Sequence, residues 1–264
     1  MWASSPTRPI PYNMSMNIDL LRCPLCHTAL TRTGGSLRCA GNHTYDVARK
    51  GYVNFANAGA DAHYGKALWQ ARRQIFDAGF FDPLLSLLQQ TAPPGVLLDA
   101  GCGEGSILRA LRPDGNGIGA DLARDAVALA APLSPTNTWL VADLAHLPLT
   151  DNSCDAVVNI LSPAAYAEFR RVLRPGGALV KAVPGPRHLE QLRRLWQTAE
   201  KAPQAADYFQ QQFPSAKRQT LTYTKPAGGH LAALCAMTPL GVHRPAPAGI
   251  DCTECTFDFI ILTA

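Results

Sequence analysis

Four residues whose side chains could bind a metal ion lie close together near the start of the chain: Cys23, Cys26, Cys39 and His43. Twelve residues separate Cys26 from Cys39, and three separate Cys39 from His43. Three thiolates and an imidazole at this spacing can form a tetrahedron around one zinc ion. Disulfides are the competing interpretation, but three cysteines and a histidine cannot pair evenly. We therefore predict a structural zinc site that holds a small ribbon.

A second group of residues with chemical potential is the segment Asp99-Ala100-Gly101-Cys102-Gly103-Glu104-Gly105, which follows the apolar residues 96–98. Glycines at Gly101 and Gly103 allow the backbone to bend sharply and to approach a bound ligand. The Lys-Ser/Thr pair of a phosphate-binding Walker loop is missing. We expect a nucleotide-like ligand at Asp99, Gly101 and Gly103, although such turns also join strands to helices in ligand-free domains.

Two aspartates follow the next apolar runs and could bind the same ligand. Asp121 ends the run 117–121, where a carboxylate can accept hydrogen bonds from both hydroxyls of a ribose. Asp143 follows the next run, 138–142, where its carboxylate could accept a hydrogen bond from the exocyclic amine of an adenine. Either aspartate could instead cap the next helix. Two of them at successive strand ends, beside a glycine loop, favour ligand binding.

The elements that must position these residues alternate in type. Apolar runs at 96–100, 117–121, 138–142, 155–161 and 177–183 predict strands, and helical spacing recurs near 105–112, 123–131, 164–174 and 187–200. Further strand-like runs at 217–224 and 255–263 flank an expected helix at 229–237. This alternation predicts an α/β fold, a doubly wound seven-stranded Rossmann-like sheet, with the small zinc ribbon at its N-terminal side.

Composition and charge restrict the class of protein. Of the 264 residues, 47% are hydrophobic and 17% are charged, and no apolar stretch approaches the ~18 residues of a membrane span. We therefore expect no membrane partner, a cytoplasmic location and reduced cysteines. Residues 21–73 carry eight basic and two acidic side chains. Such a basic zinc module suggests contact with a polyanion such as nucleic acid, and a merely solvated basic surface is the alternative.

The segment 96–183 resembles the class I S-adenosylmethionine-dependent methyltransferases. The resemblance rests on the glycine segment at 99–105 and on Arg174-Pro175-Gly176-Gly177, which resembles the turn into their fifth strand. It implies S-adenosylmethionine as cofactor, with its methionine moiety and cationic sulfonium over the glycine loop. Strand-end carboxylates would then hold the ribose and the adenine.

Nearly the full chain is similar to the RlmA family of 23S rRNA (guanine-N1)-methyltransferases. The matching motifs are Cys-Pro-Leu-Cys-His at 23–27, Gly-Tyr-Val-Asn at 51–54, Gln-Ala-Arg-Arg at 70–73, Asp-Ala-Gly at 77–79, Pro-Gly-Pro-Arg-His-Leu at 184–189 and Met-Thr-Pro at 237–239. The resemblance implies methyl transfer from S-adenosylmethionine to N1 of a guanine in a hairpin loop of 23S rRNA domain II. It also implies that the zinc module helps to hold the RNA.

The resemblance also assigns individual residues. Phe81, Ile107, Leu108 and His188 would contact the cofactor. Residues 159–163 depart from the Arg-x-Tyr-Ala-Pro sequence that we associate with the family, so the choice between neighbouring loop guanines stays open. A base must remove the N1 proton, and the candidates are Asp143, His188 and solvent reached through Asn159 or Ser162.

The expected organisation has four parts. Residues 1–20 form a disordered tail, with a later translation start at Met14 or Met16 as the alternative. Residues 21–56 form the zinc-ribbon RNA-binding domain, 57–90 form a linker with helices, and 91–264 form the methyltransferase domain. The expected partner is a 23S rRNA hairpin, and a homodimer is left open. The alternative functions are a small-molecule methyltransferase and a non-catalytic zinc-dependent RNA-binding protein.

Overall fold

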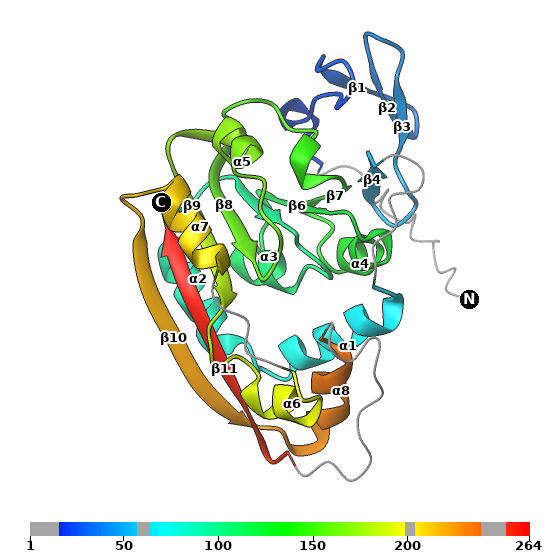
Figure 1. The fold of residues 1–264 in the computed structure, drawn as a ribbon. Helices are drawn as coiled ribbons and strands as arrows, with labels where there is room; N and C mark the ends of the chain where they lie inside the picture. Colours follow the sequence, from blue (N-terminus) through cyan, green and yellow to red (C-terminus); the bar gives the residue numbers. More distant parts are fainter. Residues whose placement is uncertain (1–15, 57–63, 199–203, 239–251) are drawn as a thin grey trace, which may run out of the picture.

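The structure, a computed structural model, describes residues 16–56, 64–198, 204–238 and 252–264. In Figure 1 a large sheet crosses the molecule, and a smaller sheet lies beyond one of its edges. The smaller sheet is antiparallel and has the order β1 (Leu30–Thr33), β2 (Ser36–Cys39) and β3 (Thr44–Asp46). Gly34 and Gly35 form the turn between β1 and β2. This small sheet is the expected ribbon.

The large sheet has the strand order β10-β11-β9-β8-β5-β6-β7-β4. Its strands are β4 (Tyr52–Asn54), β5 (Leu97–Ala100), β6 (Gly117–Asp121), β7 (Thr138–Val141), β8 (Cys154–Ile160), β9 (Leu173–Pro184), β10 (Lys217–Pro226) and β11 (Glu254–Thr263). Strands β5 to β9 run parallel, while β10 and β11 pair antiparallel beside β9. The predicted seven-stranded α/β sheet is confirmed, and β4 adds an eighth strand.

Strand β4 joins the ribbon segment to the large sheet. It lies inside the segment assigned to the ribbon, yet it pairs in parallel with β7 of the large sheet. Val53 is fully buried, and the amides of Phe55 and Ala56 both donate to the carbonyl of Val141, at 2.8 and 3.2 Å. The pairing covers a strand edge whose backbone groups would otherwise be exposed. The two sheets are therefore joined by shared residues rather than separated by a linker.

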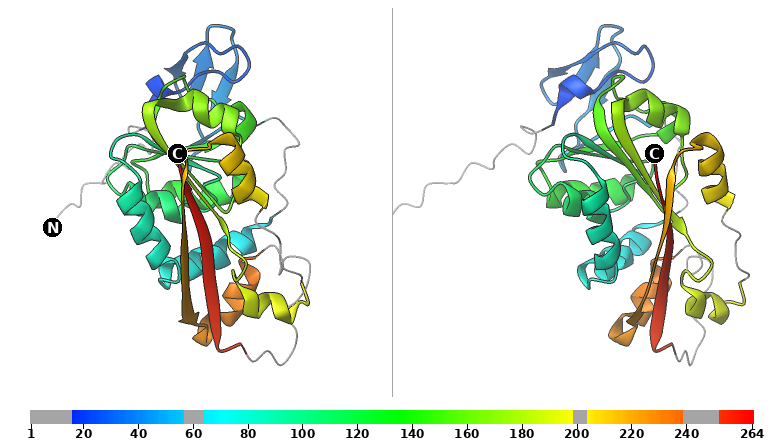
Figure 2. Two further views of the ribbon diagram at one scale, coloured as in Figure 1. Left: turned by 60° about the vertical axis from the view of Figure 1, so that its left-hand side comes forward. Right: turned by 90° about the vertical axis from the view of Figure 1, so that its left-hand side faces the viewer.

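The helices cover both faces of the large sheet, as the turned views in Figure 2 show. They are α1 (Lys66–Asp77), α2 (Asp82–Thr91), α3 (Ser106–Leu111), α4 (Arg124–Ala130), α5 (Tyr166–Val172), α6 (Glu190–Leu195), α7 (Gln204–Gln212) and α8 (Leu231–Ala236). Alternate strand residues face opposite sides. Leu97 accordingly packs in a core with α1 to α4, α6 and α8, whereas Leu98 packs in a second core with α5, α7 and the ribbon.

Several expectations differ from the structure at the level of single elements. Helix α7 was not predicted: Gln204–Gln212 is mostly polar, and its buried face consists of Ala206 and Phe209, three residues apart. Part of the expected disordered tail is ordered, since Ile18–Leu20 form a 3-10 turn and the amide of Asn17 donates to Thr138 Oγ1 at 3.3 Å. Residues 1–15 and Pro239 lie outside the described residues. Among the described residues no helix is both long and apolar enough to cross a bilayer.

Candidate functional site

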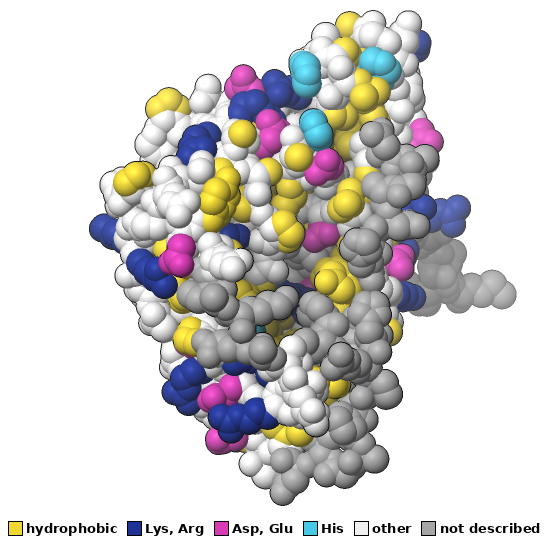
Figure 3. Space-filling view, in the orientation of Figure 1, with side chains coloured by type: hydrophobic (Ala, Val, Ile, Leu, Met, Phe, Trp, Pro, Cys, Tyr) yellow, Lys and Arg dark blue, Asp and Glu magenta, His cyan; other side chains and the backbone are white. Residues whose placement is uncertain are grey.

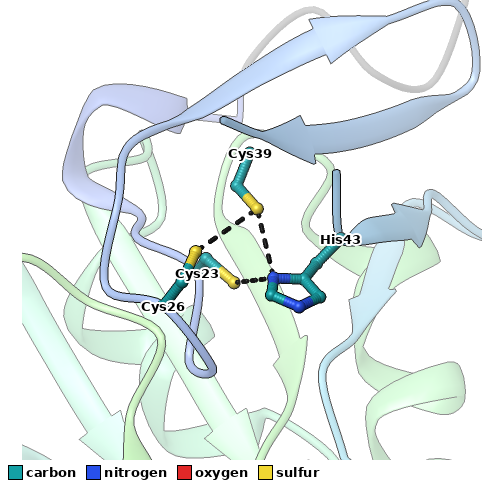
Figure 4. A group of neighbouring side chains, drawn as sticks. All are labelled: Cys23, Cys26, Cys39 and His43. Atoms are coloured by element: carbon teal, nitrogen blue, oxygen red, sulfur yellow. Dashed lines mark hydrogen bonds between the residues drawn. The ribbon is translucent and has the colours of Figure 1, made fainter. Parts of the chain in front are cut away.

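The zinc-ligand quartet comes together as predicted. The ligand atoms of Cys23, Cys26, Cys39 and His43 all lie within 4.8 Å of one another. Figure 4 shows His43 directing Nδ1 toward the sulfurs of Cys23 and Cys39, at 3.4 Å from each, and the Sγ atoms of Cys26 and Cys39 are 3.5 Å apart. A zinc tetrahedron with sulfur ligands has edges of about 3.8 Å. The donor set and its size therefore fit one zinc ion with no open coordination position.

Local structure explains why these four side chains converge. Cys23 and Cys26 lie in the turn before β1, and Cys39 ends β2. The Tyr45 hydroxyl lies 3.2 Å from the Cys23 sulfur. A hydrogen bond from the Thr28 hydroxyl is the main cause that lowers the pKa of Cys26 to about 5. The thiolate is the form that binds zinc, so a thiol that ionises easily suits a zinc ligand.

The glycine loop follows β5, where the strand order reverses between β6 and β8. Gly101 and Gly103 have φ of +84° and +53°, a conformation that favours glycine. A Cβ on Gly101 would overlap the hydroxyl of Ser162. The amide of Gly103 donates to Asp121 Oδ2 at 2.8 Å, and the amide of Ala123 donates to Asp121 Oδ1 at 2.8 Å. Asp121 thus fixes the loop, and each of its oxygens can accept another hydrogen bond.

A cavity of about 290 Å³ opens beside this loop. It brings together three of the predicted cofactor residues, Gly101, Asp121 and Asp143. The remaining wall consists of apolar or small residues that sequence reasoning did not single out as cofactor contacts: Leu122, Leu144, Ala145, Ser162, Pro163, Ala164 and Ala165. Carboxylates on one side and apolar atoms around them match the needs of a nucleoside, whose sugar is polar and whose base is flat.

Asp143 has a second set of contacts. Its Oδ1 accepts from the amide of Ala145 at 2.9 Å, and its Oδ2 lies 3.0 Å from His146 Nδ1. The backbone hydrogen bond is the main cause that lowers the pKa of Asp143. Asp143 therefore caps the 3-10 helix Leu144–His146, as the alternative to ligand binding required. The same residue also lines the cavity.

Asp99 is the most unusual acidic group near the loop. Its side chain is fully buried, and neither carboxylate oxygen accepts a hydrogen bond of ordinary length from the described residues. Burial, followed by the charges of Glu104 and Asp121, raises the pKa of Asp99 to about 8. Such an unpartnered acidic group suits a positively charged ligand. S-Adenosylmethionine carries this charge on its sulfonium and amino groups, so the residues present fit that cofactor.

Four other predicted cofactor contacts lie outside this cavity. Ile107 and Leu108 on α3 are buried in the core, and Phe81 stacks on Phe76 with ring centroids 4.2 Å apart. His188 follows β9, and its Nδ1 accepts from the amide of Asp258 at 3.3 Å. Burial lowers the pKa of His188 to about 4, so the ring is neutral at pH 7. None of these four residues lines the 290 Å³ cavity, and their contacts with the cofactor stay predictions.

Sequence reasoning gave no role to Arg72. Its Nε lies 3.1 Å from Glu104 Oε2, and its guanidinium lies 5.3 Å from the Phe76 ring centroid and 5.9 Å from that of Phe81. Arg72 therefore connects α1 to the glycine loop. In the sequence, Arg72 is marked only by its place in the Gln-Ala-Arg-Arg motif at 70–73, one of the motifs on which the family resemblance rests.

We expect the Asp121→Ala variant to bind S-adenosylmethionine more weakly by about 1.5–3 kcal/mol, roughly 10- to 150-fold, because a charged acceptor is lost. Isothermal titration calorimetry measures this change. Asp114→Ala removes an exposed carboxylate from the neighbouring loop and should bind normally. Equal affinity of the Asp121→Ala variant and the wild type would remove Asp121 from the cofactor site.

The fold and the two sites define a class I S-adenosylmethionine-dependent methyltransferase that carries a structural zinc ribbon. A family model described as the RlmA N-terminal zinc ribbon matches residues 21–56, and one for a methyltransferase domain matches 98–181. The chain belongs to the RlmA family of 23S rRNA (guanine-N1)-methyltransferases.

Curated relatives carry this assignment. YxjB of Bacillus subtilis, assigned to the 23S rRNA (guanine-N1)-methyltransferases, is 38% identical over 70% of this chain and 71% of its own length. The 23S rRNA (guanine(748)-N(1))-methyltransferase of Streptomyces fradiae is 36% identical over 66% of this chain and 67% of its own length. A Micromonospora griseorubida protein assigned to the 23S rRNA (guanine-N(1)-)-methyltransferases is 34% identical over 67% of this chain and 70% of its own length.

Proposed function

We propose that this chain transfers the methyl group of S-adenosylmethionine to N1 of one guanine in a hairpin loop of 23S rRNA domain II, in the cytoplasm, with the zinc ribbon holding the hairpin. The observation that carries this proposal is the direct attachment of the ribbon to a wall of the cofactor cavity. A base in a loop is also easier to bring into a pocket than a base in a duplex.

The attachment is formed by the segment 143–150, which leads from the cavity to the ribbon. Leu144 lines the cavity, and Leu149 bridges to Leu21 at the start of the ribbon. The amide of Arg22 donates to the carbonyl of Pro148 at 3.1 Å, and the Arg22 guanidinium pairs with Asp151 at 2.9 Å. An RNA held by the ribbon would therefore lie beside the site where the cofactor binds.

The basic residues of the N-terminal third divide into two groups. Three are used internally: Arg22 and Arg72 form ion pairs with Asp151 and Glu104, and Arg73 donates to the carbonyls of Glu104 and Leu129 at 2.6 and 3.2 Å. Five others are exposed: Arg32, Arg38, Arg49, Lys50 and Lys66. On the face of the molecule that Figure 3 presents, Lys and Arg side chains lie mainly toward the margins and apolar side chains lie nearer the centre. This arrangement suits phosphate contacts at the margin and a base at the centre.

The chemistry needs collinear placement of N1, the methyl carbon and the sulfur, and an exit for the N1 proton. S-Adenosylmethionine supplies an electrophilic methyl group when it is bound. A general base works best with a pKa near the working pH. The pKa of His188 is about 4 and its Nδ1 is already occupied, while the pKa of Asp143 is lowered by its backbone hydrogen bond. We infer that Asp143 orients the cofactor and that the proton passes to water.

Mass-spectrometric mapping of modified nucleotides tests the proposed function. A domain II transcript of 23S rRNA incubated with the protein and S-adenosylmethionine should gain N1-methylguanosine at one hairpin guanine. Absence of this nucleotide, despite cofactor binding, would overturn the proposed reaction. Activity that survives deletion of the ribbon would favour a small-molecule acceptor instead. Whether the chain forms a homodimer is a separate question, and light scattering measures the oligomeric state.

A salt-dependence measurement tests the ribbon as an RNA-binding surface. We expect the double variant Arg49→Ala with Lys50→Ala to bind the hairpin more weakly. The plot of log affinity against log salt should become less steep by about 1.5, since each phosphate contact contributes about 0.7–0.9 to its negative slope. Both side chains are exposed. Lys217→Ala, on the opposite edge of the large sheet, is the control and should leave the slope unchanged. An identical slope in the double variant would place the RNA elsewhere.

A further inference from the structure

Lys181 is a buried lysine that the proposed chemistry does not use. It lies in β9 between the apolar residues Val180 and Ala182, and its side chain is 2% exposed. Its Nζ donates to the side-chain oxygen of Asn159 and to the carbonyl of Ser162, the latter at 2.9 Å. An apolar side chain would fill a sheet position of this kind without the cost of desolvating a charge.

Asn159, in β8, connects Lys181 to the end of β5 and to the segment 161–163. It lies opposite Lys181 in the β8–β9 register. Its Nδ2 donates to the carbonyl of Ala100 at 2.7 Å and to the carbonyl of Pro163 at 3.0 Å. Both protons of the amide and its oxygen are therefore engaged. The side chain of Asn159 thus ties β5 and β9 to the segment 161–163, and it has no donor left for a substrate.

The segment 161–163 is held in an unusual conformation against the glycine loop. Leu161 has φ of +54°, which is strained for a leucine, and Ser162 fills the space in which a Cβ of Gly101 would lie. Ser162 and Pro163 form part of the cavity wall. A strained backbone persists only where its surroundings over-determine it, and the hydrogen bonds of Lys181 and Asn159 supply such contacts.

We propose that Lys181 is a positioning residue: together with Asn159 it clamps the segment 161–163 against the glycine loop and so sets the wall of the cofactor cavity. The proposal deepens the proposed function, but its first readouts need only the protein and S-adenosylmethionine. Loss of the clamp loosens the wall and weakens cofactor binding, while the sheet itself remains folded.

Lys181→Met tests the clamp, because Met keeps most of the apolar volume and removes the donor. We expect hydrogen–deuterium exchange in a peptide covering 161–166 to become at least tenfold faster, while exchange in β8 and β9 stays unchanged. We also expect the Kd for S-adenosylmethionine to rise about tenfold, whereas the KM for rRNA stays within twofold. Lys217→Met makes the same change at an exposed position of β10 and is the matched control.

Asn159→Asp provides an independent second variant. It keeps an acceptor for Lys181 but removes both hydrogen bonds to the carbonyls of Ala100 and Pro163. Faster exchange confined to 161–166 is expected here too. Unchanged exchange and unchanged cofactor affinity in both variants would overturn the proposal. Global unfolding of both variants would overturn it as well, because the pair would then be part of the core. If both variants show faster exchange confined to 161–166 but the wild-type protein does not methylate rRNA, the proposed function alone would be refuted.

Discussion

Cys39→Ser is expected to release the zinc ion, to unfold the ribbon and to abolish specific binding of the rRNA hairpin. Cys39 is 5% exposed, and its sulfur lies 3.5 Å from that of Cys26 and 3.4 Å from His43 Nδ1. Structural zinc sites contribute about 10–16 kcal/mol of binding energy to folding. The three short strands β1 to β3 cannot replace this energy by packing, because few of their residues are buried.

The effect should stay within the ribbon and its contacts. The large sheet keeps seven of its strands when β4 is lost, and the cavity residues Gly101 and Asp121 lie at the ends of β5 and β6, which do not pair with the ribbon strands. We therefore expect the Kd for S-adenosylmethionine to change by less than about threefold. Metal analysis, hairpin binding and calorimetry on the same sample measure the three quantities.

Cys252→Ser is the matched control, because Cys252 is a half-buried cysteine outside the quartet. It should retain one zinc ion per chain and full hairpin binding. Stoichiometric zinc in the Cys39→Ser variant would contradict the four-ligand site. Normal hairpin affinity after zinc loss would contradict the ribbon's role in holding RNA.

Some of the site could be predicted because its signals are local or follow from strand geometry. All four zinc ligands lie within 21–56, and their spacing alone defines the donor set. Asp121 and Asp143 were placed together because parallel strands end at one edge of a sheet. The structure confirms that both line one cavity with Gly101.

Other features depend on contacts between distant residues. Strand β4 is three residues long and shows no periodicity, and its pairing with β7 joins Tyr52 to Trp139 across the intervening helices α1 to α4 and strands β5 and β6. Lys181 interrupts an apolar run, and only the neighbouring strand shows that Asn159 is its partner. The sequence at 97–105 predicts the glycine loop, but not that Asp99 lacks a hydrogen-bond partner.

Asp99→Asn is expected to stabilise the cofactor-free protein and to weaken its binding of S-adenosylmethionine. The pKa of Asp99 is raised to about 8 by burial, whereas in the unfolded chain it takes the ordinary value near 4. The folded state therefore binds more protons between these values, and its stability falls as the pH rises from about 4 to about 8. Asn cannot ionise, so this loss, about 1.4 kcal/mol per pH unit, disappears from the variant.

Thermal melting of the cofactor-free protein at several pH values measures this difference. The gain in Tm of the Asp99→Asn variant over the wild type should be larger at pH 8 than at pH 6. Asp114→Asn alters an exposed carboxylate and should melt like the wild type at both values. A gain in Tm that does not change with pH would show that Asp99 is ionised in the folded protein throughout this range.

The same variant should bind S-adenosylmethionine roughly 10- to 150-fold more weakly, since the carboxylate no longer meets the positive charge of the cofactor. The unfavourable free energy of burying an unpartnered carboxylate is thus offset when a cationic ligand binds beside it, and this offset contributes to the affinity. Calorimetry at pH 8 tests this coupling. A variant that is more stable and yet binds the cofactor as tightly as the wild type would show that the burial of Asp99 serves the loop alone and not the ligand.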